Sequence, residues 1–157
     1  GMKRPHNVVN SLFLSPEKLE ETNFERYDRY RVIEEKETMY EEYRMEDAEI
    51  CIAAFGIAAR VSKNAIDEAR AMGIKVGMIR PITLWPFPKA PFRRAAEQVK
   101  EVISVELSMG QMIEDVRLAT ECRVPVTLCN RVGGMIPSPE QVLDAILKAA
   151  KNGGKEA

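Results

Sequence analysis

Residues 73–92 read GIKVGMIRPITLWPFPKAPF, and this stretch decides how the chain around it is organised. A short apolar run from Lys75 to Ile79 has the character of a buried strand. Beyond Arg80, each proline fixes φ and withholds a backbone donor, so the segment is expected to be neither regular helix nor central strand. The prolines are Pro81, Pro86, Pro88 and Pro91. The pattern predicts a strand that opens into a stiff loop of fixed shape.

The loop carries two large aromatic side chains, Trp85, which is the only tryptophan of the chain, and Phe87. Rings of this size need apolar surroundings, so both must pack against protein. They either fold back over the end of the sheet or face a partner as a docking surface. The residues alone leave both possibilities open.

The chain from Glu49 onward alternates short apolar runs with amphipathic helices, which is typical of a parallel α/β sheet. The expected strands are residues 50–55, 75–79, 102–106 and 124–129. Four helices are expected. The first follows Gly56, the second runs from about Phe92 to Lys100, and the fourth begins at Ser138-Pro139. The third carries an apolar face made of Met109, Met112, Ile113, Val116 and Ala119. The sequence therefore predicts one α/β domain over residues 49–151.

The segment before this domain has a different texture. Residues 3–14 are expected to be irregular or extended, after which Ser15-Pro16-Glu17 supplies the start of a helix. The helix is predicted to continue to about Tyr43, and its apolar face is incomplete. We expect residues 1–48 to form a lead-in and a charged arm that lies across a surface, and residues 152–157 to fray.

Composition excludes several classes of function. The chain has 157 residues, 45% of them hydrophobic and 30% charged, which suits one well-buried core. A formal net charge of -1, with basic and acidic residues interleaved, offers no field for nucleic acid. No apolar window approaches the length of a membrane helix, and no signal peptide is present, so a cytoplasmic protein without membrane contact is expected. Gly1 before Met2 has the look of a cleaved tag, so a fragment of a longer protein is expected.

Cysteine and histidine usage argues against metal and acid–base chemistry. Cys51, Cys122 and Cys129 lack the close spacing of zinc or iron–sulfur ligands, so free thiols and no metal site are expected. His6, the lone histidine, lies in the lead-in, far from any strand end. No G-x-S-x-G elbow supports a serine nucleophile. We therefore predict no catalytic residue in this chain.

Function is expected at the rim, by which we mean the segments that follow residues 55, 79, 106 and 129, because ligands and partners meet the carboxyl ends of parallel strands. Ser108-Met109-Gly110-Gln111 at a helix start either caps that helix or offers free N–H groups to an anion. Glu106 is either an acid–base group or a structural hydrogen-bond acceptor. The candidate anion-binding residues are Arg80, Ser108, Gly110 and Arg131.

Several motifs together resemble a known family. They are RPITLWPFP at residues 80–88, VISVELSMGQMIEDVRLA at 102–119 and VGGMIPSPEQVLDAI at 132–146. They look like the C-terminal part of the alpha subunit of 2-oxoacid:ferredoxin oxidoreductases. HNVVNSLFLSPEKLE, at residues 6–20, resembles the 2-ketoisovalerate branch of that family.

The resemblance implies a transketolase C-terminal-like fold, with three layers, α/β/α, around a mostly parallel sheet, preceded here by the long charged helix. It also implies an enzyme that converts a branched-chain 2-oxoacid to an acyl-coenzyme A and reduces ferredoxin. The thiamine diphosphate, iron–sulfur clusters and coenzyme A of such an enzyme are expected mainly in other regions or subunits, because this chain lacks a Gly-Asp-Gly motif and a ferredoxin-type cysteine set.

On this basis we expect an assembly domain whose rim contacts the rest of the alpha subunit or neighbouring subunits. The expected interface residues are Arg80, Pro81, Leu84, Trp85, Pro86, Phe87, Glu106 and Gln111. Two alternatives stay open: the rim binds coenzyme A or another anion directly, or the chain is a stand-alone α/β interaction module.

Overall fold

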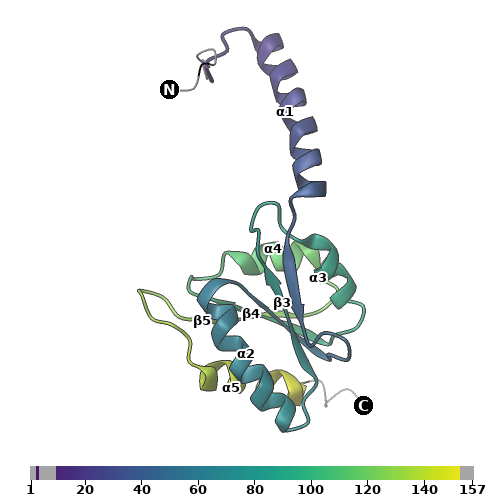
Figure 1. The fold of residues 1–157 in the computed structure, drawn as a ribbon, viewed down its shortest axis with the longest axis vertical. Helices are drawn as coiled ribbons and strands as arrows, with labels where there is room; N and C mark the ends of the chain where they lie inside the picture. The colour runs from purple at the N-terminus through teal and green to yellow at the C-terminus, as the bar shows by residue number, and fades with distance from the viewer. Residues whose placement is uncertain (1–2, 4–9, 153–157) are drawn as a thin grey trace. The chain divides into compact units, whose positions relative to one another are not determined.

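The computed structural model describes residue 3 and residues 10–152, and it divides the chain into two compact units, Gly1–Lys36 and Glu37–Ala157. The first unit contains helix α1, Pro16–Lys36 (Figure 1). Ser15 caps it as expected, because the Lys18 N–H donates to Ser15 Oγ at 3.3 Å. None of the residues of α1 is buried. His6 and the tail 153–157 lie outside the described residues.

The expected continuation of this helix to about Tyr43 is wrong. Residues Tyr40–Tyr43 form strand β1, which pairs antiparallel with β3, Val76–Pro81, in the register Tyr40 to Pro81 and Tyr43 to Met78. The sequence YEEY has no strong local preference for a strand. Pairing with the exposed edge of β3 overrides the helix propensity of its glutamates.

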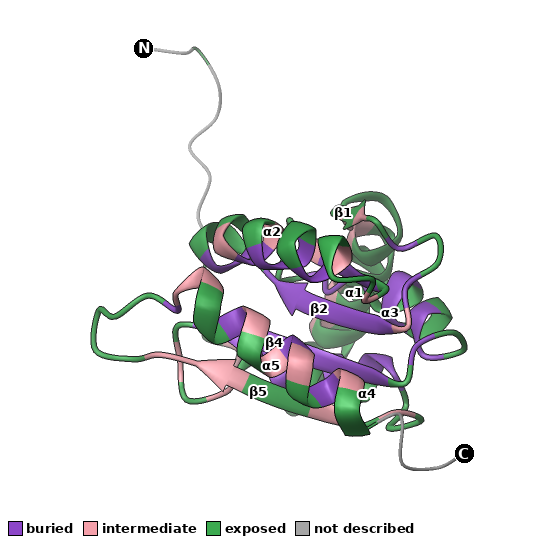
Figure 2. Cartoon of the chain, turned by 90° about the horizontal axis from the view of Figure 1, so that it is seen from below, coloured by how far each residue is buried: buried purple, intermediate pink, exposed green. Residues whose placement is uncertain are grey.

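The second unit contains a sheet of five strands in the order β1-β3-β2-β4-β5. The remaining strands are β2, Ile50–Ala54, β4, Glu101–Glu106, and β5, Val126–Asn130, and every pairing except β1 with β3 is parallel. The central strands β2 and β4 are buried throughout, whereas β5 lies at an edge and is half exposed (Figure 2). The predicted strands are thus present, with β1 added.

Helices cover both faces of the sheet and make three layers. α2, Gly56–Ala71, and α5, Pro139–Asn152, pack on one face, while α3, Lys89–Ala95, and α4, Met112–Ala119, lie on the other (Figure 1). Each face of the sheet has its own hydrophobic core, and alternate side chains of β2 contribute to the two cores. Ile50, Ile52 and Ala54 face α2 and α5, whereas Cys51 and Ala53 face α3 and α4. The three-layer α/β/α prediction is confirmed.

Two boundaries differ from expectation because of prolines. β3 continues to Pro81, which is tolerated because the pairing with β2 ends at Ile79 and β1 begins opposite Pro81 at Tyr40. α3 runs from Lys89 to Ala95 rather than from Phe92 to Lys100. Pro91 is accommodated in its first turn, where the backbone N–H has no partner within the helix.

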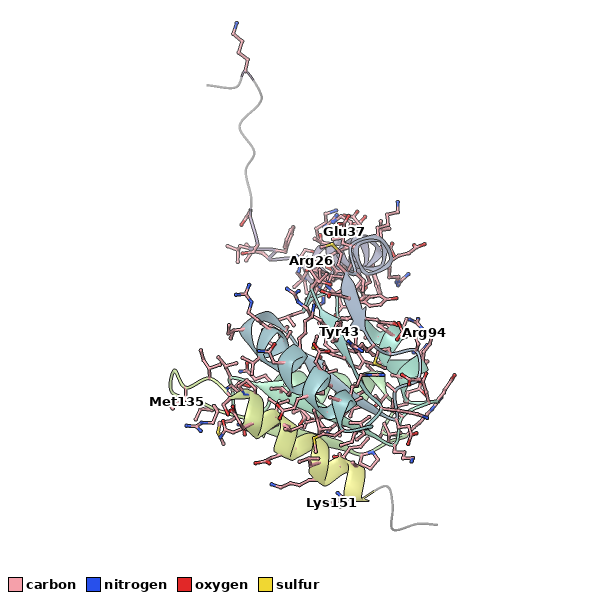
Figure 3. All side chains as sticks on the ribbon, turned by 60° about the horizontal axis from the view of Figure 1, so that its bottom comes forward. Arg26, Glu37, Tyr43, Arg94, Met135 and Lys151 are labelled. Atoms are coloured by element: carbon pink, nitrogen blue, oxygen red, sulfur yellow. The ribbon has the colours of Figure 1, made fainter. Side chains whose placement is uncertain are left out.

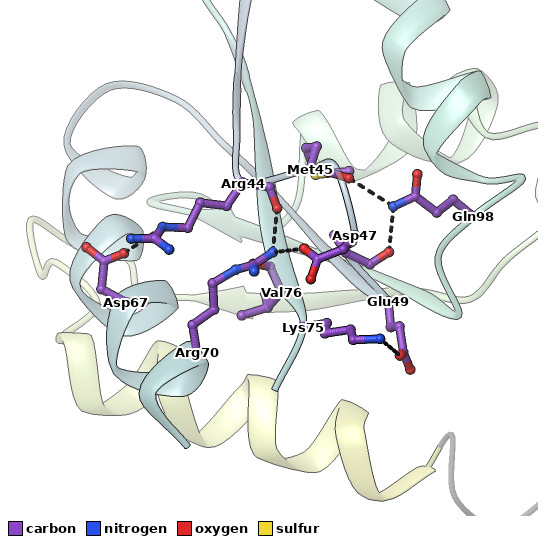
Figure 4. Close-up of polar contacts among 10 residues, drawn as sticks. Arg44, Met45, Asp47, Glu49, Asp67, Arg70, Lys75, Val76 and Gln98 are labelled. Atoms are coloured by element: carbon purple, nitrogen blue, oxygen red, sulfur yellow. Dashed lines mark hydrogen bonds and ion pairs between the residues drawn. The ribbon is translucent and has the colours of Figure 1, made fainter. Parts of the chain in front are cut away.

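The loop between β1 and β2 is fastened to the amino ends of the strands, opposite the rim (Figure 4). Arg70 donates from Nε to the Val76 carbonyl and from Nη2 to the Arg44 carbonyl and to Asp47 Oδ1, all at 2.7 Å. Gln98 adds two hydrogen bonds from Nε2 to carbonyls of the same loop. These contacts hold β1 in register against β3.

Candidate functional site

The carboxyl ends of β2 and β4 form a topological switch point. The chain leaves β2 for α2 on one face of the sheet and leaves β4 for α4 on the other, so the two connections diverge. A hollow of about 400 Å³ lies there, which we call the switch-point hollow. Its lining consists of Phe55, Leu84, Glu106, Leu107, Ser108, Gln111, Met112 and Asp115. The rim expected from the sequence is therefore hollowed at this point.

Glu106, the last residue of β4, is 2% exposed and caps α4 from beneath. Its Oε2 accepts the N–H groups of Gln111 at 2.9 Å and Met112 at 3.0 Å, and its Oε1 accepts the Ile113 N–H at 2.8 Å. The hydroxyls of Ser104 and Ser108 each donate to the same carboxylate at 2.8 Å. Every acceptor site of the carboxylate faces a donor.

This bonding explains the charge state of Glu106. Burial works to raise its pKa, but the hydrogen bonds from Gln111, Ser104, Ser108 and Met112 outweigh it and hold the pKa below the ordinary value. An ionised carboxylate at the amino end of α4 also complements the helix dipole. Of the two roles left open for Glu106, the geometry is that of a structural acceptor.

The same bonding bears on the anion site expected at Ser108 and Gly110. The first N–H groups of α4 are occupied by the chain's own carboxylate, and the Gly110 N–H donates to Ser108 Oγ at 3.1 Å. An external anion would have to displace Glu106, which is buried. Capping of the helix, the other reading of this motif, is what the structure shows.

The proline loop, residues 82–88, is anchored on both sides. Thr83 Oγ1 donates to the Pro86 carbonyl at 2.8 Å and accepts the Met39 N–H at 3.0 Å, while the Ile82 N–H donates to the Met39 carbonyl. Phe87 stacks on Phe92 with ring centroids 5.3 Å apart and an interplanar angle of 12°. The loop is thereby tied to the segment before β1 and to the core under α3.

These contacts separate the expected interface residues into two groups. Leu84, Trp85 and Gln111 are exposed, and Arg80 is half exposed. Pro81, Pro86, Phe87 and Glu106 are buried instead of lying on the surface. The expectation is corrected for these four: their side chains complete the core and the α4 cap, and so support the surface from beneath.

Exposed apolar side chains follow the carboxyl ends of β2, β3 and β4. We define the docking surface as Phe55, Ile82, Leu84, Trp85, Leu107 and Met109, which are between 37% and 79% exposed. Three of them line the hollow itself. A second exposed apolar group, with Met135, lies on the loop between β5 and α5, where it points away from the sheet (Figure 3).

The remaining rim residues are positioned by polar contacts. Asn130 donates from Nδ2 to the Ser108 carbonyl at 2.6 Å, and the Arg131 N–H donates to the Glu106 carbonyl at 3.2 Å, so the end of β5 is tied to the end of β4. Arg80 pairs through Nη1 with Glu41 Oε2 at 3.1 Å. Sequence reasoning missed Glu41 and Thr83, because their roles depend on pairing of β1 with β3.

No metal centre or membrane span is found in the part of the chain that the structure describes. There, no group of three or more His, Cys, Asp or Glu side chains could hold a metal ion. No helix within residues 10–152 combines the length and apolarity needed to cross a bilayer. Cys51 is buried, which raises the pKa of its thiol to about 12. Cys129 is half buried because β5 is an edge strand, and Cys122 is exposed.

Comparison with known sequences gives consistent matches. Residues 48–142 match the family described as pyruvate:ferredoxin oxidoreductase core domain II. Over 144 residues the chain is 50% identical to the ketoisovalerate oxidoreductase subunit VorB of Methanothermobacter marburgensis, which covers 92% of this chain and 41% of that protein. It is 36% identical over 103 residues to the 2-oxoglutarate synthase subunit KorA of Methanothermobacter thermautotrophicus, covering 66% of this chain and 27% of the relative. The chain thus spans about two fifths, or less, of these relatives.

Solved structures share the fold. A 2-oxoglutarate:ferredoxin oxidoreductase from Magnetococcus marinus, solved with 2-oxoglutarate, coenzyme A and succinyl-CoA bound, superposes with a TM-score of 0.71. The match has 21% sequence identity and covers 87% of this chain and 24% of that chain. A split-gene transketolase, an inactive beta4 tetramer, matches with a TM-score of 0.59 over 68% of this chain and 39% of its own, at 19% identity. At these identities the likeness concerns the fold alone.

Proposed function

This chain belongs to the pyruvate:ferredoxin oxidoreductase core domain II family, and from that premise we propose that it is the C-terminal assembly domain of the alpha subunit of a 2-ketoisovalerate:ferredoxin oxidoreductase. The resemblance drawn from RPITLWPFP and its companion motifs is confirmed by the family match, and the ketoisovalerate branch by the identity to VorB. The proposed whole enzyme decarboxylates a branched-chain 2-oxoacid, forms an acyl-coenzyme A and reduces ferredoxin.

The observation that carries this proposal is the docking surface. Six large apolar side chains stand exposed beyond the carboxyl ends of β2, β3 and β4, and three of them line the switch-point hollow, in a chain that spans 41% of the VorB relative. Exposed apolar groups gathered in this way mark contacts with other protein. The rest of the alpha subunit, together with neighbouring subunits, is the proposed partner.

The support beneath the docking surface suits such a role. Thr83 and the stacked pair Phe87 and Phe92 hold the proline loop before any partner arrives. A loop that is already ordered loses less conformational entropy on docking than a flexible one, so more of the contact energy appears as affinity. The prolines serve association without any part in chemistry.

The described residues offer no ligand set for the metal-containing cofactors that such an enzyme requires. They offer no set of three metal ligands for an iron–sulfur cluster or for the metal of a diphosphate. At the switch point the best-placed carboxylate, Glu106, is buried and fully engaged in capping α4. We therefore propose that reaction steps take place in other regions, and that this chain alone has no turnover.

Substitution of Trp85 by alanine tests the proposal. The side chain is 56% exposed, so its removal should cost the isolated chain no more than about 1 kcal/mol of stability. As a central aromatic anchor, it should cost about 2–4 kcal/mol of association free energy, or roughly 30- to 1000-fold in Kd. Thermal melting of the chain and sedimentation of the whole enzyme measure the two effects separately.

Leu118→Ala is the matched control, because Leu118 is 74% exposed on α4 and lies outside the docking surface. It should leave both melting and subunit association unchanged. If Trp85→Ala instead abolishes the melting transition of the chain while assembly of the remaining folded protein is normal, Trp85 is a core residue and the docking role is refuted.

A further inference from the structure

A second hollow, of about 430 Å³, lies beside the amino end of α2 and the end of β3. Its lining residues are Gly56, Ile57, Ala59, Arg60, Lys63 and Arg80. None of them lines the switch-point hollow or belongs to the docking surface. Three of the six side chains are cationic and none is acidic. We call this feature the basic hollow.

The positive charge of the basic hollow is only partly balanced. Glu41 on β1 approaches it with one oxygen 2.7 Å from Lys63 Nζ and the other 3.1 Å from Arg80 Nη1. The hydrogen bond from Lys63 is the main reason that the pKa of Glu41 is lowered, so this carboxylate is ionised at neutral pH. One negative charge thus faces three positive ones. Two positive charges remain in excess.

Two donors in the basic hollow lack acceptors within residues 10–152. Arg80 Nε is buried and makes no hydrogen bond, which is costly for a charged donor unless something else supplies an acceptor. Arg60, one helical turn from the start of α2, is exposed and makes no ion pair or hydrogen bond with another described residue. Guanidinium groups in this state are matched by oxyanions, which accept two parallel N–H bonds.

The amino end of α2 adds to the same field. α2 has 16 residues, and no side chain caps it: Phe55 occupies the N-cap position and supplies no polar atom. Gly56 takes φ +57, and a Cβ there would meet nothing within 4 Å, so the space before the helix is open. α4 differs, since Glu106 fills its first N–H groups. The uncapped end of α2 directs partial positive charge toward three cationic side chains.

From these four observations we propose that the basic hollow is a binding site for a phosphate group. An excess of two positive charges, guanidinium donors and helix N–H groups match a tetrahedral dianion better than a single carboxylate. The hollow, at about 430 Å³, is larger than one phosphate, so the group belongs either to free phosphate or to a molecule that carries a phosphate ester or diphosphate. The proposal is independent of the docking role, because the two sites share no residue.

Isothermal titration calorimetry of the 157-residue chain with phosphate, pyrophosphate and succinate at low salt tests this site. We expect saturable binding of phosphate or pyrophosphate that weakens as NaCl rises, and much weaker binding of succinate. Tighter binding of pyrophosphate indicates a diphosphate-bearing ligand, and equal binding of the two indicates a monophosphate. Absence of saturable heat for both phosphates up to about 10 mM, well above a weak Kd of 1 mM, overturns the proposal.

Variants localise the binding. Arg60→Gln removes a cation that has no described partner, so the melting temperature should stay unchanged while the Kd rises about tenfold, which corresponds to 1.4 kcal/mol. Lys63→Met should have a similar effect on the Kd. Arg117→Gln, an exposed cation on α4 outside the basic hollow, is the control and should bind as the unsubstituted chain does. Binding that survives both substitutions, or that Arg117→Gln abolishes, contradicts the assignment.

Discussion

Glu106→Gln is the substitution that most directly probes how the rim is built. Glutamine keeps the shape of the side chain, but one oxygen becomes an NH₂ group that must face donors. The less costly orientation puts this NH₂ toward Ser104 and Ile113, since the Ser104 hydroxyl can turn and accept. The Ile113 N–H then has no acceptor, and the amino end of α4 loses its negative charge.

The magnitude follows from these two losses. An orphaned buried donor costs about 1–3 kcal/mol, and loss of a partly buried charge at a helix terminus costs about 1–2 kcal/mol. The two effects share the same atoms, so their costs do not simply add. We therefore expect the substitution to lower the free energy of unfolding by about 2–4 kcal/mol, less than the sum of the two upper limits. At roughly 4 °C per kcal/mol for a domain of this size, the melting temperature should fall by about 8–16 °C.

The effect should also depend on pH. The pKa of Glu106 is lower in the folded chain than its ordinary value of about 4.3, which applies to the unfolded chain. At a pH between the folded and the unfolded pKa, the unfolded chain therefore binds more protons than the folded chain. The stability that the carboxylate contributes is therefore complete above about pH 4.3 and is lost as the pH falls through the folded pKa. Glutamine does not titrate, so the stability gap between the two chains should narrow in that window.

Urea unfolding of the unsubstituted chain and of Glu106→Gln between pH 7 and pH 3.5 measures the difference in their free energies of unfolding. The control is Glu114→Gln on the same helix, whose carboxylate is 65% exposed and should matter by less than about 0.5 kcal/mol. If Glu106→Gln costs no more than this control at pH 7, or if the gap stays constant as the pH falls below 4.3, the account of Glu106 as an ionised cap is refuted.

Three further substitutions test the packing at the two ends of the sheet. Gly77→Ala should destabilise the chain by about 1–3 kcal/mol in urea unfolding, because the new Cβ would lie 2.5 Å from the Arg44 carbonyl oxygen; an unchanged midpoint would contradict that close approach. Arg70→Met should cost about 2–3 kcal/mol by the same assay and increase amide exchange in residues 44–47, since two hydrogen bonds to the loop and one to the Val76 carbonyl of β3 are lost; exchange at the native rate would argue against the network. Phe92→Ala should cost about 3–5 kcal/mol and loosen the proline loop, because Phe92 is fully buried beneath Phe87; a loss below about 1 kcal/mol would show that the stack is dispensable.

The layers of the fold were predictable from periodicity. Strand β2 is a continuous apolar run, β4 carries Val102, Ile103 and Val105 between its terminal glutamates, and α2 and α5 carry apolar residues at helical spacing. The identity of these elements therefore depends on local pattern. β1 could not be found in this way. Its four residues are two tyrosines and two glutamates, and they become a strand because β3 offers an unpaired edge.

An exposed edge of the sheet could be predicted from the sequence, but its hydrogen bonding could not. The rule that function gathers at the carboxyl ends of parallel strands pointed to Leu84, Trp85 and Gln111, which are exposed, and their contact with a partner stays a prediction. Whether the Glu106 side chain faces solvent or the start of α4 depends on the turn at residues 107–111. The spacing of residues in the sequence does not specify the shape of that turn. The same is true of Phe87, whose burial requires Phe92 to arrive from the next helix.

The central claim is that the rim of this chain is covered by other protein in the assembled enzyme. Hydrogen–deuterium exchange, compared between the purified chain and the complete oxidoreductase, measures this directly. The account predicts added protection at residues 82–85 and 107–111 on assembly, with residues 44–47 at the opposite edge unchanged. Equal exchange at the rim in both states, with new protection confined to other surfaces, would contradict it.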